Sequence, residues 1–274
     1  GTRGIVYRDG DLSSWTVDNR LVGTWFTDRT ENTLLIGVDY QDLETDGLEL
    51  DNFAFSTIDI FDPTYGNFTP VSPADLTRRN ITKEQTGLYL QNQLRLDDRW
   101  IFLAGARYDQ AEVVDRNLTA ASRQRADDDQ ISLSGGVMYL ADNGFSPYLS
   151  WTESFQPIAG VDNNGNLYEP RVGEQLEFGV KYAPNSLDGY VTAAIYNIEE
   201  ENSLVTSPSG FQVQEGVRET QGFELESVAY LTEQLELTAA YTYNDATTDN
   251  TSDNQPAAAA NLIPRHSASV WLDY

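Results

Sequence analysis

The sequence predicts an all-β protein folded as an antiparallel meander, and three observations lead to this prediction. Apolar residues recur at every second position in many segments, which is the period of a strand with one buried face. Helical periodicity is nearly absent, and no stretch approaches the roughly 20 apolar residues of a transmembrane helix. Turn residues separate the alternating segments, as in a large sheet of consecutive strands.

Four segments carry the alternation most clearly. Their apolar positions are Leu88, Leu90, Leu94 and Leu96; Leu176, Phe178, Val180 and Tyr182; Leu235, Leu237, Ala239, Tyr241 and Tyr243; and Ala268, Val270, Leu272 and Tyr274. Polar residues occupy most of the positions between them, such as Gln91, Lys181 and Glu236. Since neighbouring side chains of a strand point to opposite faces, the sheet should have one apolar and one polar face.

About twelve strands follow from these signals. We expect them at residues 3–9, 14–27, 32–45, 80–97, 99–115, 129–142, 145–155, 171–183, 187–203, 211–231, 235–247 and 265–274. Short connections, such as Asp97–Arg99, alternate with long ones at 46–79, 116–128, 156–170, 203–210 and 248–264. Short turns at one end and long loops at the other are typical of a bacterial outer-membrane β-barrel.

Aromatic residues gather toward the predicted strand ends. They are Tyr40, Trp100, Tyr108, Tyr148, Trp151, Tyr182, Tyr243, Trp271 and Tyr274. An amphipathic ring prefers the boundary between lipid and water, so membrane barrels carry aromatic girdles at both rims. The girdle interpretation stands beside a simpler one, because aromatic residues are favoured in any strand.

Composition excludes several classes of function. With 43 Asp and Glu against 17 Lys and Arg, the formal net charge of −26 repels polyanions, so no nucleic acid is expected as a partner. The absence of cysteine excludes disulfides and thiolate metal sites. A single histidine, His266, leaves little room for histidine catalysis, and no carboxylate pair stands out as a catalytic acid and base. We therefore expect no enzyme.

Eight segments, in order along the chain, resemble the barrel of TonB-dependent siderophore receptors of the ferrichrome (hydroxamate) type. They are residues 35–41, 85–93, 103–109, 146–157, 168–182, 219–226, 240–246 and 263–274. The most recognisable runs from Ser146 to Pro157, and the run from Tyr168 to Tyr182 follows it at the family's spacing. No single segment is decisive, but their order covers nearly the whole chain.

The resemblance implies that residues 1–274 form part of the receptor's β-barrel domain. The family's barrel has about twenty-two strands, so about twelve would make an incomplete barrel, an open and curved sheet. We expect the N-terminal plug domain and the final strands to lie outside this chain. An open sheet has two unpaired edges, so the isolated chain should pair its edges or flatten, and it should not transport by itself.

The resemblance also implies a function. The full-length parent is expected to be an outer-membrane receptor and transporter, in a Gram-negative bacterium, for uptake of a ferric hydroxamate siderophore energised by the TonB system. Its partners would be the ferric siderophore, TonB, the plug domain and outer-membrane lipid, with no cofactor. The iron arrives already chelated, so no direct metal ligands are needed. A soluble all-β binding or adhesion module and a passive porin are the alternatives.

Four aromatic residues are the candidates for ligand binding: Phe155, Phe61, Tyr65 and Phe55. Ring faces offer contact area to a compact, partly apolar chelate. Phe155 is implied by its place in the run Glu153–Pro157, although it could equally be a wall residue. Phe61 stands where the family presents a tyrosine, so the ring is kept and the hydroxyl is lost. The rings at 53, 55, 65 and 68 could instead form a cluster that holds a long loop together.

Charged residues that alternate with apolar ones should face the lumen and pair with one another. We assign Arg107, Glu153, Glu174, Glu177, Lys181, Glu224 and Glu226 to this group. The segment Asp162–Asn166 resembles the start of a calcium loop, but Gly173 occupies the position where such a loop needs glutamate. A polar hairpin loop is therefore the preferred interpretation of that segment.

Overall fold

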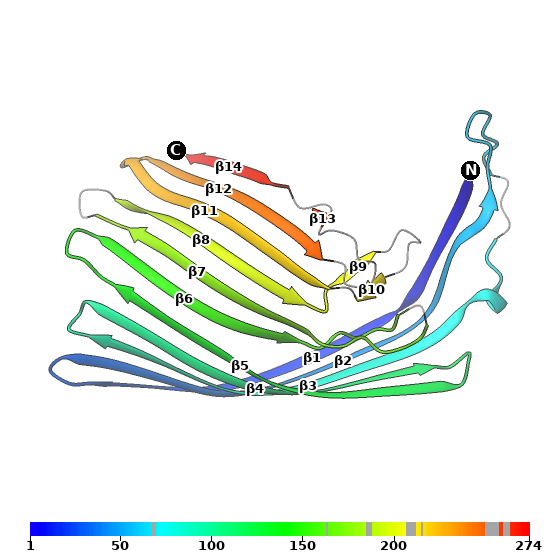
Figure 1. The fold of residues 1–274 in the computed structure, drawn as a ribbon, viewed down its shortest axis with the longest axis horizontal. Helices are drawn as coiled ribbons and strands as arrows, with labels where there is room; N and C mark the ends of the chain where they lie inside the picture. Colours follow the sequence, from blue (N-terminus) through cyan, green and yellow to red (C-terminus); the bar gives the residue numbers. More distant parts are fainter. Residues whose placement is uncertain are drawn as a thin grey trace.

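The computed structural model describes residues 1–66, 70–162, 164–184, 188–206, 212–214, 216–249, 258–259 and 264–274. Within these residues one sheet of 12 strands carries the fold, and its strand order follows the chain (Figure 1). Every ladder between consecutive strands is antiparallel. The predicted all-β meander is confirmed.

The strands of the sheet have the following bounds. They are β1 Thr2–Phe26, β2 Thr30–Thr57, β3 Thr77–Leu96, β4 Trp100–Asn117, β5 Ser122–Tyr139, β6 Phe145–Gln156, β7 Arg171–Tyr182, β8 Gly189–Glu201, β11 Val217–Thr232, β12 Leu235–Asp249, β13 Ala258–Ala259 and β14 His266–Asp273. A separate hairpin pairs β9 (Leu204–Thr206) with β10 (Gln212–Gln214), and a 3-10 turn, η1, spans Pro73–Asp75.

The sheet is strongly curved and open (Figure 1). In the described part of the chain no ladder joins β1 to β13 or β14, so the two ends of the sheet are not connected. This confirms the expected open, curved arrangement of an incomplete barrel. Pairing of the free edges with another chain, or flattening in solution, stays a prediction.

Several predicted strand boundaries were wrong. Segments 3–9 and 14–27 form the single strand β1, in which Gly10 pairs with Gly47. The connection predicted at 46–79 shrinks to 58–76, and the one predicted at 116–128 shrinks to 118–121. The segment 211–231 divides into β10 and β11. The extensions at 77–79, 116–117 and 122–128 carry mostly polar residues on both faces, so alternation does not mark them. The extension of β2 does alternate, with Leu48 and Leu50 set against Glu49 and Asp51, and was missed. The connection predicted at 248–264 falls mostly outside the described residues.

Cross-strand register builds one continuous apolar face. Residues directly opposite each other in adjacent strands share a face. One such row runs from β3 to β12 through Leu94, Phe102, Val137, Leu149, Phe178, Ile195, Phe223 and Tyr243. Phe178 and Ile195 are 50% and 56% exposed in this row. An exposed apolar face of this breadth requires an apolar surrounding, and lipid supplies one.

Aromatic rings border the apolar face at both ends on β4 and its neighbours. Trp100 contacts Tyr139 near the short turns, with ring centroids 4.8 Å apart. Tyr108 lies eight residues along the strand, which is roughly 26 Å of strand and roughly 20 Å of height at a barrel's usual tilt. Tyr148, assigned above to a girdle, instead lies on the opposite face, where its hydroxyl donates to Glu177 Oε1 at 2.6 Å.

On the polar face, long side chains lie flat across glycines of the neighbouring strand. A Cβ at Gly179 would come within 2.5 Å of the Tyr148 ring, so no larger residue fits there. The same close approach pairs Gly37 with Tyr89, Gly87 with Arg107, and Gly222 with Tyr196. Each ring or guanidinium covers backbone that glycine leaves bare. Glycine at these positions therefore leaves room for the large side chains that cross the neighbouring strand.

The face assignment predicts unequal effects of two arginine substitutions in the intact protein. Leu176→Arg should destabilise the folded barrel by about 2–4 kcal/mol, because the charge would sit near the middle of the apolar band. Thr152→Arg, one position along the neighbouring strand and on the polar face, should cost far less. Urea unfolding in lipid vesicles measures both, and equal losses would contradict the face assignment.

The close approach at Gly37 predicts a compensating pair. Gly37→Ala should destabilise by about 1–3 kcal/mol, because its Cβ would overlap the Tyr89 ring. In the background of Tyr89→Ala the same substitution should cost clearly less, giving a non-additive double-mutant cycle. Additive losses in unfolding experiments would show that the ring does not set the requirement for glycine.

Candidate functional site: a pocket beneath two long connections

The polar face carries an ion network that joins β2, β3 and β4. Arg107 donates to both carboxylate oxygens of Asp39, at 2.6 and 3.0 Å, and to both of Asp109, at 2.7 and 2.6 Å. Asp109 is 1% exposed and also accepts from Gln85 at 2.9 Å. Such bidentate pairs fix geometry as well as charge. The prediction that Arg107 pairs on the polar face is confirmed. The network links the strands next to the end of the sheet that carries the long connections.

At that end, the β6–β7 connection (residues 157–170) folds into a small hairpin of its own. Val161 and Leu167 form an isolated bridge. At the tip, Asp162 Oδ1 accepts from the backbone N–H groups of Asn164 and Asn166, each at 2.8 Å. This confirms the polar hairpin interpretation. Partial desolvation opposes ionisation, but these hydrogen bonds outweigh it and hold the pKa of Asp162 below its ordinary value.

Glutamine side chains hold this connection on two sides. From β5, Gln124 Oε1 accepts from Leu167 N at 3.2 Å, while its Nε2 donates to the carbonyl oxygen of Gly165. From β10, Gln214 Oε1 accepts from Glu169 N at 2.7 Å, while its Nε2 donates to Glu169 O at 2.6 Å. Tyr168, between Leu167 and Glu169 in sequence, is buried and donates to Gln212 O at 3.2 Å.

A pocket of about 500 Å³ lies between these connections and the inner wall of the first strands. Its lining comes from β1–β3, the β6–β7 connection and the β9–β10 hairpin, and consists of Arg8, Glu49, Asp51, Arg79, Ile81, Ala159, Gly160, Val161, Asp162, Tyr168, Leu204 and Gln212. By register the wall residues lie on the polar face. The pocket therefore opens on the inner side of the curve, at the end with long connections.

Both arginines of the pocket are paired with acids. Arg8 contacts Asp51 at 2.6 Å, and Arg79 contacts Glu49 at 2.9 Å and Asp115 at 3.5 Å. The side chain of Asp115 is only 5% exposed. The lining carries two arginines and three acids, of which Asp162 is held by N–H groups of its own hairpin. The pocket therefore offers polar edges, aliphatic surface and a tyrosine with a small negative excess. Such a lining suits a compact ligand of mixed polarity rather than a bare ion.

The four predicted ligand residues are not gathered in this pocket, and none of them is among its described lining residues. Phe61 and Tyr65 lie in the β2–β3 connection and are 92% and 79% exposed. Phe55 is half-buried near the end of β2. Phe155 is half-buried near the end of β6 and lies opposite Val172, on the face of Leu149. Phe68 and the side chain of Phe53 lie outside the described residues.

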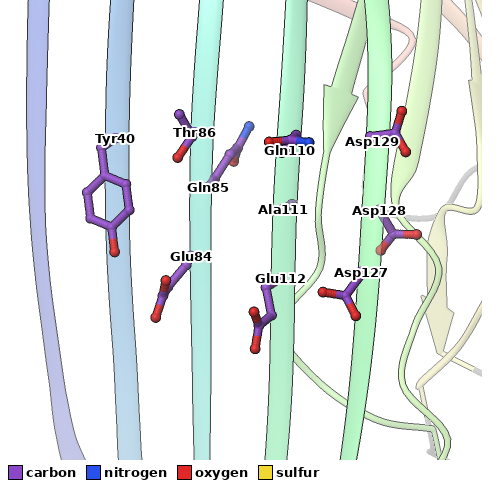
Figure 2. Close-up of a pocket in the computed structure, with 10 residues that line it drawn as sticks. All are labelled: Tyr40, Glu84, Gln85, Thr86, Gln110, Ala111, Glu112, Asp127, Asp128 and Asp129. Atoms are coloured by element: carbon purple, nitrogen blue, oxygen red, sulfur yellow. The ribbon is translucent and has the colours of Figure 1, made fainter.

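A second pocket, of about 330 Å³, lies on the other face, beyond the aromatic rim (Figure 2). Three of its carboxylates follow from register, since Glu84, Glu112 and Asp127 form one row with Asp42 across β2–β5. Arg125 offsets part of this charge, at 3.1 Å from Glu112 and 2.7 Å from Asp127. Like charges placed opposite each other in a sheet are destabilising. Sequence reasoning missed this row, although these acids share parity with the apolar residues of their strands.

A second acidic row corrects a prediction. Glu153, Glu174, Glu199 and Glu219 lie opposite one another across β6, β7, β8 and β11. Glu174 shares the face of Leu176, so its assignment to the lumen was wrong, and its parity, read against the apolar set, would have given the right face.

Glu153 has the parity of Leu149, but it lies beyond the end of the β5–β6 ladder. Its carboxylate accepts from Leu133 N at 2.8 Å and lines a pocket with the inner-face residues Asp39 and Arg107. In the described residues no group of three or more His, Cys, Asp or Glu could hold a metal ion.

No helix among the described residues is both long and apolar enough to cross a membrane.

The comparisons with known proteins agree with this architecture. The family model described as "TonB dependent receptor-like, beta-barrel" matches residues 2–274. The chain is 36% identical to the ferrichrome outer membrane transporter/phage receptor of Escherichia coli, and 37% identical to the ferrioxamine B receptor of Salmonella typhimurium. Both matches cover 99% of this chain, and they cover 37% and 38% of the relatives.

A solved structure of the siderophore receptor PiuA from Acinetobacter baumannii shares the fold, with a TM-score of 0.76 at 21% identity. That match covers 97% of this chain and 44% of the PiuA chain. This chain thus spans little more than a third of the length of the two curated relatives. Because the family model matches from the second residue to the last, the chain belongs to the TonB-dependent receptor family, as a part of its β-barrel.

Proposed function

We propose that the protein containing this chain takes up a ferric hydroxamate siderophore across the outer membrane. One observation carries the proposal: the ferrichrome and ferrioxamine B receptors match 99% of the chain at 36% and 37% identity. Ferrichrome and ferrioxamine B are both iron(III) hydroxamates. Two receptors for chelates of the same chemistry, at similar sequence identity to this chain, support a hydroxamate rather than a catecholate substrate.

The receptor family and these relatives are receptors and transporters, so the chain is not an enzyme. Membership of the family locates it in the outer membrane of a Gram-negative bacterium. In the proposal, the exposed apolar face contacts membrane lipid, a plug domain fills the inner side of the barrel, and the TonB system supplies the energy for release. The chelated iron is cargo and meets no direct protein ligand.

The pocket beneath the two connections supports the proposal by its size and chemistry. At about 500 Å³ it lies within the range of small-molecule sites. Its largely paired charges suit a compact chelate with amide and methylene groups. Phe61 and Tyr65, exposed in the neighbouring β2–β3 connection, offer ring faces to the same end of the barrel, and Phe55 joins them in the proposed ligand set.

Phe155 shares the register face of Leu149, but it lies beyond the end of the β5–β6 ladder, where Glu153 of the same parity already lines a pocket with Asp39 and Arg107. It is therefore kept in the set.

The two alternatives have less support. A passive porin would need no plug and no TonB. A soluble binding or adhesion module would not need an apolar outer face that is 40–56% exposed at Phe102, Leu149, Phe178 and Ile195. Uptake of ⁵⁵Fe-labelled siderophore that stops in cells lacking TonB would exclude both alternatives, whereas unchanged uptake would favour the porin.

Ligand binding is tested on the whole protein in detergent by quenching of tryptophan fluorescence. Ferric ferrichrome, ferric ferrioxamine B and a ferric catecholate are titrated separately, with a non-binding protein to correct for absorption by the complexes. Saturable quenching by one or both hydroxamates is the expected result. Saturation by the catecholate alone would overturn the hydroxamate assignment, and saturation by none would overturn the proposal.

The proposed ring contacts are tested one residue at a time. Phe61→Ala, Tyr65→Ala, Phe55→Ala and Phe155→Ala should each raise the Kd of the bound hydroxamate by about tenfold, equivalent to about 1.4 kcal/mol. Phe102→Ala, on the apolar face near the short turns, is the control and should leave the Kd unchanged. A variant that matches this control removes its residue from the ligand set.

A further inference from the structure

Two connections that are distant in sequence are joined by one side-chain amide. Gln214, on the short strand β10, forms three hydrogen bonds. Its Oε1 accepts from Glu169 N at 2.7 Å, and its Nε2 donates to Glu169 O at 2.6 Å and to Asn202 O at 3.1 Å. Glu169 belongs to the β6–β7 connection and Asn202 follows β8, so Gln214 contacts both of the segments that it joins.

The geometry of this contact is that of an additional rung of a β-ladder. A carboxamide presents one donor and one acceptor side by side, as a peptide group does. By bonding to both the N–H and the C=O of Glu169, it satisfies two backbone groups that no strand partner satisfies. Glutamine and asparagine can make this double contact, whereas glutamate lacks the donor and leucine lacks both groups.

Two further bonds cross the same junction. Asn202 Nδ2 donates to Pro170 O at 2.8 Å, and the hydroxyl of Tyr168 donates to Gln212 O at 3.2 Å. Asn202 has a φ of 60°, a conformation that asparagine tolerates better than most residues. Residues 168–170 are therefore tied to the β9–β10 hairpin and its flanks at three successive positions.

The opposite side of the β6–β7 connection is held by the same kind of clamp. Gln124 of β5 bonds through one carboxamide to Leu167 N and Gly165 O. The β6–β7 connection is thus hydrogen-bonded to two glutamine amides, one from strand β5 and one from the β9–β10 hairpin. Tyr168, which stands in sequence between the two contacted residues Leu167 and Glu169, is 8% exposed.

We propose that Gln214 is a positioning residue that joins the β6–β7 connection and the β9–β10 hairpin into one rigid unit covering the 500 Å³ pocket. The two segments then move together when the ligand leaves. Both segments contribute lining residues, among them Val161 and Tyr168 from the first and Leu204 from the second. If the two segments open together, the hydrogen bonds of Gln214 stay intact while the ligand enters or leaves. The same bonds oppose the opening of either segment alone.

The role in ligand exchange rests on the proposed function, whereas the mechanical role does not. Loosening the junction should let either segment open separately. The dissociation rate of a bound ferric hydroxamate should then rise by about tenfold, while the association rate changes little, because changes at one binding site act mostly on dissociation.

The experiment uses the whole protein in detergent and has two readouts. The first is amide hydrogen exchange at single-residue resolution, which needs no ligand. Gln214→Ala removes the acceptor of Glu169 N–H and should speed exchange at Glu169 at least tenfold, leaving Leu167 unchanged. Gln214→Glu keeps that acceptor and loses only the donor to Glu169 O and Asn202 O, so it should speed exchange at Glu169 less than Gln214→Ala does. Gln124→Ala should do the reverse, speeding exchange at Leu167 more than at Glu169. Gln234→Ala, which removes the same side chain at the short turn between β11 and β12, is the control for both sites.

The second readout is the dissociation rate of ferric ferrichrome or ferric ferrioxamine B, whichever binds. Asn202→Gly serves as a second variant, because glycine keeps the backbone conformation and removes only the amide. Faster dissociation in Gln214→Ala and Asn202→Gly, with less than additive effects in the double variant, is the expected result. Unchanged amide exchange at Glu169 in Gln214→Ala would show that Gln214 does not join the two segments. Faster amide exchange with an unchanged rate of siderophore dissociation would show that the junction has no role in ligand release. If the wild-type protein binds no siderophore while exchange responds as expected, the proposed function fails and the junction stands.

Discussion

The register of the antiparallel ladders is the constraint on which every other feature depends. One slip of a single residue would carry the apolar row through Phe102 and Phe178 to the inner side, and would place Arg107 toward lipid. The ladders hold the two faces in phase from β1 to β14 through consecutive pairs. Short turns fix that register at one end of the sheet, and the glycines beneath Tyr89, Tyr148 and Tyr196 accommodate large rings on the inner side.

The same register explains why the two ends of the sheet differ. Near the short turns the outer face is apolar and bordered by Trp100 and Tyr139. Beyond Tyr108 the outer face carries a row of carboxylates instead, and the strands continue past it, with Asn117 of β4 opposite Arg79 of β3. The strands therefore project past the lipid and support the connections above them. The pocket and both glutamine clamps lie on this projecting part.

Much of the fold could be predicted from sequence, because alternation over segments such as 88–96 and 176–182 reports a two-faced strand directly. The projecting parts could not, since residues such as those of 122–128 are polar on both faces and carry no periodic signal. The site was harder still. Arg107 was recognisable as an inward-facing charge, but its partners Asp39 and Asp109 follow only from register and geometry. Gln124 and Gln214 carry no sequence signal at all, because their roles come from where backbone groups lack a partner.

The central claim is that this chain is barrel wall, with its even-numbered β4 residues in lipid and its odd-numbered residues toward the lumen. Spin labels placed singly from Trp100 to Tyr108, in the whole protein reconstituted in lipid bilayers, test it most directly. The account predicts that accessibility to oxygen peaks at the even positions and falls at each odd position between them, with a period of two. Accessibility without that alternation, or with the opposite phase, would contradict the face assignment and the account built on it.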